Sequence, residues 1–200
     1  MPRTRHQTQE LPPGYPGSYE CVVRLADGRE VTISPILPSD ATELAEAIRT
    51  ADAETIRARF LGAPPPLTDA VLDGLTRVDY VRCFALVARN GGHGVAIARY
   101  AVMPPSGDEA LTAEVAVAVT PDWRRAGLAT ALVEMLAHRA LECGITDLSA
   151  MFLAQNRPVT ELAHGGQAKV VIAHGIAELH AVLAKPHEDG PDLSGANEHQ

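Results

Sequence analysis

The segment from residue 113 to 144 constrains the fold more than any other part of the chain. Residues 113–119 read Ala-Glu-Val-Ala-Val-Ala-Val, an apolar run typical of a strand. A basic turn follows at 122–130, and the helix predicted at 127–143 places Leu128, Leu132 and Leu136 on one stripe. Gly144 supplies the stop signal of that helix. This order of strand, short turn and long amphipathic helix predicts a domain in which a sheet and a helix pack together.

The turn at 122–130 has the composition of an anion-binding loop. Gly127 lacks a Cβ atom, so the backbone there can approach a phosphate closely, and Ala129 keeps the next turn small. Arg124 and Arg125 add positive charge, and the N–H groups and dipole of a helix start favour an anion. Arg-x-x-Gly-x-Ala is nevertheless a short pattern, and a surface loop that begins a helix explains it equally well. The turn alone leaves both interpretations open.

Strand and helix patterns alternate along the rest of the chain. Helical spacing predicts helices at 40–53, up to Phe60, from Thr68 onward and at 158–164. Asp40 and Glu43 are spaced as a capping box for the first of these helices. Apolar runs between turn signals predict further strands at 19–25, 30–33, 83–88, 94–102, 111–119, 147–153, 168–173 and 178–183. The pattern is that of an α+β protein.

Both ends of the chain have the composition of solvated tails. Residues 1–18 contain four prolines among polar residues, and residues 186–200 carry four acidic residues and neither Lys nor Arg. We therefore expect one domain at residues 19–185 between two disordered tails. The acidic tail holds part of the formal net charge of -8, so that charge says little about any site.

The composition argues against several classes of protein. Aromatic residues make up 4% of the chain and its net charge is negative, so we expect no nucleic acid partner. The three cysteines are far apart and, like the histidines, lack metal-ligand spacing, so we expect neither a disulfide framework nor a metal site. Nothing approaches the roughly 18 consecutive apolar residues of a membrane span. We expect a soluble, cytoplasmic protein with no membrane partner.

Glu114 is the acidic residue within the apolar run 113–119. Burial of this carboxylate would raise its pKa well above the usual range, and a carboxylate so perturbed serves as a general base near neutral pH. A Glu114 that simply points to solvent at the start of the strand explains the same residue. Cys143, late in the long helix, is expected to be a packed thiol.

Taken together, these segments resemble the GCN5-related N-acetyltransferase (GNAT) superfamily, whose signature is [Gln/Arg]-x-x-Gly-x-[Gly/Ala]. The signature here is Arg124-Arg125-Ala126-Gly127-Leu128-Ala129, which lies between the strand of Glu114 and Asn156. Two earlier stretches further resemble the acetyltransferase domain of bacterial Pat-type protein lysine acetyltransferases. They are Val78-Asp79-Tyr80-Val81-Arg82 and the segment with Arg57, Arg59 and Phe60, residues that either line an acceptor groove or form ordinary helix surface.

The resemblance implies a GNAT (acyl-CoA N-acyltransferase) fold, with a mixed, mostly antiparallel sheet of six to seven strands flanked by helices. It implies direct transfer of an acetyl group from acetyl-CoA to a primary amine, with the lysine of a protein as the favoured acceptor. Glu114 would be the general base, and a backbone N–H near Val117 would stabilise the oxyanion. The coenzyme A thioester would be held by Val117, Ala118, Val119, Arg124, Arg125, Ala126, Gly127, Leu128, Ala129, Thr130 and Asn156.

The chain departs from the family pattern after Asn156. Many members place a tyrosine there that protonates the leaving thiolate, whereas this chain has Ala163 and no tyrosine after Tyr100. Gly165-Gly166 stands in place of the usual Gly-Phe. Two alternatives to a protein lysine acetyltransferase therefore stay open. One is a small-molecule amine acetyltransferase, and the other is a catalytically weak acyl-CoA-binding regulatory module.

Overall fold

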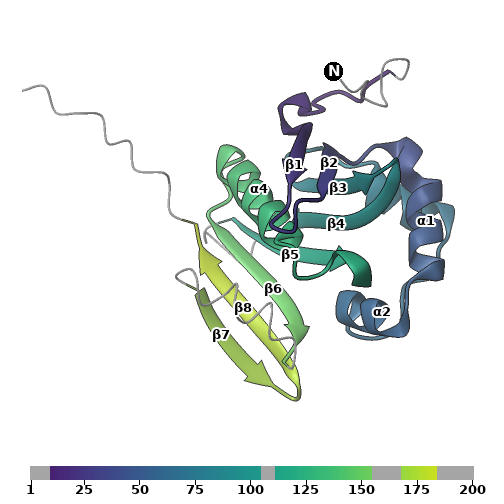
Figure 1. The fold of residues 1–200 in the computed structure, drawn as a ribbon. Helices are drawn as coiled ribbons and strands as arrows, with labels where there is room; N and C mark the ends of the chain where they lie inside the picture. Colours follow the sequence, from purple (N-terminus) through teal and green to yellow (C-terminus); the bar gives the residue numbers. More distant parts are fainter. Residues whose placement is uncertain (1–9, 105–110, 155–167, 184–200) are drawn as a thin grey trace, which may run out of the picture.

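The computed structural model describes residues 10–104, 111–154 and 168–183, and it places eight strands in a single sheet (Figure 1). The helices are α1 (Ala41–Thr50), α2 (Ala53–Phe60), α3 (Asp69–Thr76) and α4 (Leu128–Glu142). The strands are β1 (Cys21–Arg24), β2 (Glu30–Pro35), β3 (Cys83–Asn90), β4 (His93–Val102), β5 (Thr112–Val119), β6 (Asp147–Leu153), β7 (Ala168–Ala173) and β8 (Ile176–Val182).

The strand order is β1-β2-β3-β4-β5-β6-β8-β7, and every neighbouring pair is antiparallel except β5 and β6. Parallel neighbours need a crossover connection, which α4 provides between β5 and β6. Figure 1 shows β6, β8 and β7 diverging from the layer that contains β1 to β5. β5 and β6 are thus the strands at which the two parts of the sheet separate.

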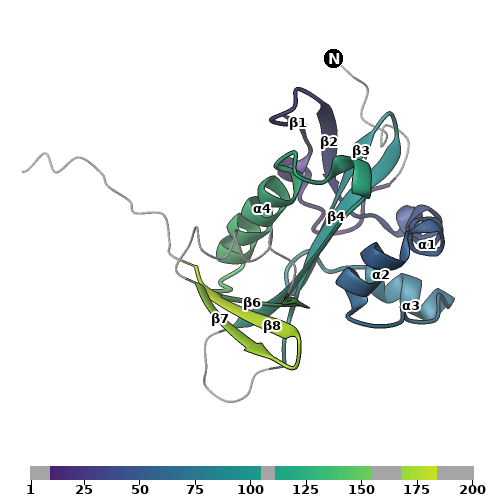
Figure 2. The same ribbon diagram turned by 60° about the horizontal axis from the view of Figure 1, so that its bottom comes forward.

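Helices cover both faces of the sheet. α4 lies on one face, and α1, α2 and α3 lie on the other (Figure 2). α4 buries Leu128, Leu132, Leu136 and Ala140, a stripe at helical spacing, against the central strands. The α+β fold predicted from the sequence is confirmed. The sheet has eight strands rather than six to seven, because both strands of the β1–β2 and β7–β8 hairpins join it.

The prediction of a disordered tail at residues 1–18 is wrong for its last part. Tyr15 packs edge-on against Tyr80 with ring centroids 5.6 Å apart, and its hydroxyl donates to Glu20. Gly17–Tyr19 forms a 3-10 turn that buries Tyr19 beside Phe84. The two tyrosines bury enough apolar surface to hold this proline-rich segment on the domain.

Several expectations fall on other parts of the chain. The helix predicted at 158–164, Asn156 and the acidic tail at 186–200 lie outside the described residues. Within the ranges given above, no helix is both long and apolar enough to cross a membrane.

Candidate active site

The sheet opens between β5 and β6. These strands pair only where residues 112–114 face residues 147–149. β5 continues to Val119 and remains paired with β4 along this length. On its other side, residues 115–119 have no neighbouring strand in the described part of the chain, and we call this side the open edge of β5. Such an edge offers backbone N–H and C=O groups to an extended ligand.

The backbone groups of β5 alternate between its two sides. The N–H of Thr120, directly after the strand, donates to the carbonyl of Val95 on β4 at 3.0 Å. In an antiparallel pair every second residue bonds to the same neighbour, so Ala118 also directs its backbone groups toward β4. Val117 and Val119 therefore direct theirs toward the open edge.

The turn before α4 contains two residues with left-handed backbone conformation. The φ angle is 61° at Arg125 and 84° at Gly127. α4 begins at Leu128 without a capping side chain, and the N–H of Ala131 donates to the carbonyl of Gly127 at 3.1 Å. The N–H groups of the first helical turn before Ala131 have no partner within the helix. Together with the helix dipole, they form the kind of site that binds a phosphate.

The β1–β2 hairpin supports this turn from outside. The guanidinium of Arg29 lies over the ring of Trp123, 4.0 Å from its centroid, and donates to the carbonyl of Asp122 at 3.0 Å. The N–H of Ala26 donates to the carbonyl of Ala126 at 3.3 Å. The sequence predicts the hairpin but not its contact with the turn, because nothing local links segments so far apart.

Arg124 lies between the open edge of β5 and α2. Its Nε donates to the carbonyl of Val119 at 3.2 Å. Its terminal nitrogens contact Glu54 Oε1 at 3.1 Å and Thr55 Oγ1 at 2.7 Å. The side chain thus connects the first turn of α2 to the end of β5. A contact between this guanidinium and a pyrophosphate stays a prediction.

Glu114 has an exposed side chain and lies at the point where β5 and β6 part. It shares one face of β5 with Ala116 and Ala118, because side chains two residues apart point to the same side of a strand. Of the two explanations that the sequence allows, the structure shows the solvent-exposed one. An exposed carboxylate at this position can still accept a proton from an incoming group.

A cavity of about 420 Å³ lies between helices α1 and α2 and the sheet face formed by β3, β4 and β5. Most of its lining is aliphatic and includes Ala116 and Ala118. Arg59 and Phe60 also line it, whereas Arg57 is exposed on α2 and does not. The sequence allowed either an acceptor groove or helix surface for these three residues. In the structure, Arg59 and Phe60 line a cavity and Arg57 lies on the helix surface.

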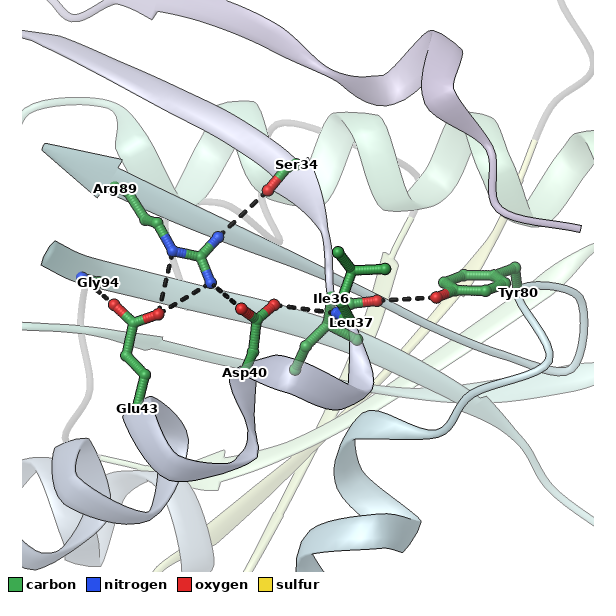
Figure 3. Close-up of polar contacts among 8 residues, drawn as sticks. All are labelled: Ser34, Ile36, Leu37, Asp40, Glu43, Tyr80, Arg89 and Gly94. Carbon is green, nitrogen blue, oxygen red and sulfur yellow. Dashed lines mark hydrogen bonds and ion pairs between the residues drawn. The ribbon is translucent and has the colours of Figure 1, made fainter. Parts of the chain in front are cut away.

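At one end of the cavity, which we call the Arg89 end, a buried arginine is fully paired (Figure 3). Arg89 Nη2 lies 2.9 Å from Asp40 Oδ1 and 3.0 Å from Glu43 Oε2, and Nη1 donates to Ser34 Oγ at 3.2 Å. The other oxygen of Glu43 accepts from the N–H of Gly94 at 2.9 Å. The Asp40 side chain makes no cap hydrogen bond to α1; its Oδ2 accepts instead from the N–H of Leu37 at 2.9 Å, at the start of the 3-10 turn Pro38–Asp40. The predicted capping box is wrong, because the two carboxylates serve Arg89 instead.

Further along β4 lies the second end of the cavity, which we call the Arg59/Arg99 end. The guanidinium of Arg59 lies 5.0 Å from the centroid of the Phe60 ring, and Arg99 Nη2 lies 2.9 Å from Cys83 Sγ. Burial and the charge of Arg99 lower the pKa of Arg59, and the attraction of Glu114 opposes that shift. The sequence did not single out Arg99, although a charged residue within an apolar strand is a signal for it.

Other residues singled out in the sequence have ordinary surroundings. Cys143 is partly buried and packs against the core, and the three cysteines are free. Across the described ranges, no group of three or more metal-binding side chains gathers in one place. The candidate site therefore consists of Glu114 where β5 and β6 part, the open edge of β5, and the turn before α4.

Comparison with known proteins identifies the family of this chain. Residues 50–164 match the model of the acetyltransferase (GNAT) family. The chain is similar to acetyltransferase PA5475 of Pseudomonas aeruginosa, with 31% identity over 145 residues, 70% of this chain and 76% of that protein. It is also 29% identical over 140 residues to acetyltransferase Pat of Mycolicibacterium smegmatis, where the match covers 70% of this chain but 41% of Pat.

Solved structures share the fold. The GNAT domain of S. lividans PAT superimposes with a TM-score of 0.75 at 28% identity, over 84% of this chain and 99% of that domain. A putative acetyltransferase from Salmonella typhimurium, solved with its cofactor acetyl-CoA, superimposes with a TM-score of 0.60 at 19% identity, over 82% and 98% of the chains. With a family model that matches more than half of its length, this chain belongs to the GNAT family and is an acetyltransferase.

Proposed function

We propose that this chain transfers an acetyl group from acetyl-CoA directly to a primary amine, and that the amine is the side chain of a protein lysine. The observation that carries the proposal is the position of the open edge of β5 next to the uncapped start of α4. The strand ends at Val119 and the helix begins at Leu128. An extended thioester arm and its pyrophosphate need these two features side by side.

The acyl donor is held, in this proposal, by backbone on both sides of the turn. Val117 and Val119 direct N–H and C=O groups toward the open edge, which suits the amides of a pantetheine arm. Gly127 is exposed, and a Cβ added to it would meet nothing within 4 Å. The full set comprises Val117, Ala118, Val119, Arg124, Arg125, Ala126, Gly127, Leu128, Ala129, Thr130 and, by resemblance alone, Asn156.

Glu114 accepts the proton of the attacking amine. A lysine ammonium with an ordinary pKa of about 10.4 must lose a proton before its nitrogen can attack. The nitrogen bonds to the thioester carbonyl carbon, and the N–H of Val117 donates to the oxygen that gains negative charge. The carbon–sulfur bond then breaks and coenzyme A leaves as a thiolate, while the nitrogen gives up its second proton to that thiolate or to water. Glu114 takes the amine proton directly or through a water molecule.

Two observations favour a protein lysine as the acceptor. The chain superimposes on the GNAT domain of S. lividans PAT with a TM-score of 0.75, and its sequence resembles the Pat-type protein lysine acetyltransferases. Outside the acidic tail the chain still has 17 Lys and Arg against 21 Asp and Glu, and this negative balance also favours approach to lysine-rich surfaces. A small-molecule amine is the second candidate, and the cavity of about 420 Å³ favours it because that volume suits a small ligand.

Binding of acetyl-CoA tests the proposed donor site. Gly127 precedes α4 and Gly144 follows its C-terminal end, with φ angles of 84° and 77°, and neither has atoms within 4 Å of an added Cβ. Gly127→Ala and Gly144→Ala should therefore each cost about 1–2 kcal/mol of stability through backbone strain. We expect Gly127→Ala alone to weaken acetyl-CoA binding in a calorimetric titration, by about tenfold or more, because its Cβ meets the phosphate. A wild type without affinity for acetyl-CoA contradicts the proposal.

Acetyl transfer tests the proposed acceptor. The protein is incubated with acetyl-CoA and either lysine peptides or a panel of small amines, and the products are identified by mass spectrometry. A mass gain of one acetyl group on the lysine side chain supports the protein acceptor. Transfer to free amines with none to peptides supports the second candidate, and binding of acetyl-CoA without any transfer supports a regulatory module.

A further inference from the structure

The cavity contains three arginines with unequal surroundings. Arg89 contacts two carboxylates and a serine hydroxyl. Within the described ranges, Arg59 and Arg99 form no ion pair with any carboxylate. Arg59 contacts the ring of Phe60, and Arg99 contacts the sulfur of Cys83. Positive charge at the Arg59/Arg99 end is thus less neutralised by the protein than at the Arg89 end.

This arrangement is unfavourable without a ligand. Arg59 and Arg99 are both partly buried, and the hydration that a guanidinium loses in this way is costly when no anion compensates for it. Arg59 and Arg99 also repel each other, as the lowered pKa of Arg59 reflects. The contact between Arg59 and Phe60 offsets only a small part of these costs. An anion bound between the two side chains would remove both penalties.

The two arginines are close to the expected site of transfer. Arg59 interacts with Glu114, and Arg99 faces Ala116 in the register of β4 and β5. Ala116 is the neighbour of Val117, which the proposed mechanism assigns to the oxyanion. Two positive charges beside one carboxylate leave a net charge that a single anionic group balances. The rest of the lining is largely aliphatic, which suits a small organic molecule or side chain.

We propose that Arg59 and Arg99 bind a carboxylate carried by the acceptor, so that the preferred substrate is an amine with a nearby carboxylate. The inference rests on the proposed acetyl transfer to an amine and adds the chemistry by which the acceptor is selected. Arginine suits this role because its planar guanidinium donates two parallel hydrogen bonds to a carboxylate. The carboxylate belongs either to a free amino acid or to an acidic residue next to the lysine of a protein.

Matched acceptors test the inference by calorimetric titration with and without coenzyme A, conditions in which no transfer occurs. One pair is L-leucine and 3-methylbutan-1-amine, which differ only in the carboxylate. The other pair is two lysine peptides that differ by Asp or Asn beside the lysine. We expect the carboxylate member of at least one pair to bind roughly tenfold more tightly or better, since charged hydrogen bonds are the strong ones. The pair that shows the preference identifies the source of the carboxylate.

Substitutions at Arg59 and Arg99, with a control at Arg57, assign the preference to its residues. Arg59→Gln and Arg99→Gln should each reduce the preference severalfold, and the lysine variants at both positions should retain part of it. Arg57→Gln is the matched control, because Arg57 is exposed on the same helix outside the cavity. Equal binding of both members of both pairs by the wild type overturns the inference. A preference that survives both glutamine substitutions overturns it as well.

The titrations also separate this inference from the proposed function. A carboxylate preference with no acetyl transfer supports the inference and contradicts the transfer. Transfer to amines with equal affinity for both members of each pair supports the proposed function and contradicts the inference.

Discussion

The two ends of one cavity, the Arg89 end and the Arg59/Arg99 end, differ in how far the protein neutralises the charge of their arginines. At the first end, Asp40 and Glu43 lie within 3.0 Å of the Arg89 guanidinium, and the side chains of Arg89 and Asp40 are each 8% exposed. At the second end, Arg59 and Arg99 contact an aromatic ring and a thiol, and among the described residues neither forms an ion pair, although Glu114 attracts Arg59. A charge satisfied within the protein holds the structure together, whereas one left without a counter-charge is available to a ligand. Four substitutions test this difference.

The largest effect is expected from Arg89→Leu at the Arg89 end. The substitution leaves Asp40 and Glu43 close together without their cation, so the free energy of unfolding should fall by about 3–5 kcal/mol. Urea denaturation measures the loss. Arg77→Leu is the control, since its pair with Asp73 is well exposed and contributes at most about 1 kcal/mol. Equal losses in the two variants would show that the buried cluster stabilises no more than a surface pair.

Glu114→Gln separates chemistry from stability beside the Arg59/Arg99 end. The rate of acetyl transfer near pH 7 should fall by roughly 10² to 10⁴-fold, because the amide cannot accept the amine proton. The free energy of unfolding should stay near that of the wild type, since the side chain is exposed. Glu134→Gln, an exposed position on α4, is the matched control. Full activity of Glu114→Gln would remove the assigned base.

Tyr80→Phe tests a single hydrogen bond near the Arg89 end. The buried Tyr80 hydroxyl donates to the carbonyl of Ile36 at 2.9 Å (Figure 3). Its removal leaves that carbonyl without this donor and should cost about 1–3 kcal/mol of stability. Thermal unfolding of the two proteins gives the difference. An unchanged Tm would mean that water replaces the hydroxyl.

Arg59→Gln should have the smallest effect on stability. The variant loses the contact with Phe60 but no longer confines a guanidinium near Arg99, so its free energy of unfolding should lie within about 0.5 kcal/mol of the wild type or above it. Urea denaturation at low salt measures the sign of this change in the free energy of unfolding. A loss as large as that of Arg89→Leu would mean that Arg59 has a structural role and that the two ends do not differ.

The part of the site that could be predicted from sequence is the part whose signals are local. The apolar run of β5, the glycine at 127 and the periodicity of α4 each depend on neighbours in the chain, and the helix begins one residue after the predicted start. Family resemblance then related these segments to an acetyl donor. Nothing beyond the chain itself was needed to expect a sheet beside this helix.

The cavity depends on contacts between distant segments, so the sequence did not predict it. Arg89 meets Asp40 across a separation of 49 residues, and the spacing of Asp40 and Glu43 matched a helix cap equally well. Arg99 contributes to a pair of positive charges only because α2 carries Arg59 into the same cavity. Tyr15 and Tyr80 likewise join two distant segments by packing together, and the composition of residues 1–18 does not predict that contact.

The position of Arg124 links two parts of the molecule thermodynamically. Its Nε occupies the carbonyl of Val119, and the same guanidinium contacts the first turn of α2 through Glu54 and Thr55. A carbonyl oxygen can accept two hydrogen bonds, so a ligand donor can bind beside Arg124 or replace it, and only replacement loosens the contact with α2. In the second case linkage is reciprocal: the free energy by which the ligand loosens α2 equals the free energy by which fixing α2 weakens that ligand at the end of β5. The helix over the cavity and the strand beside it therefore respond together to a ligand that replaces Arg124.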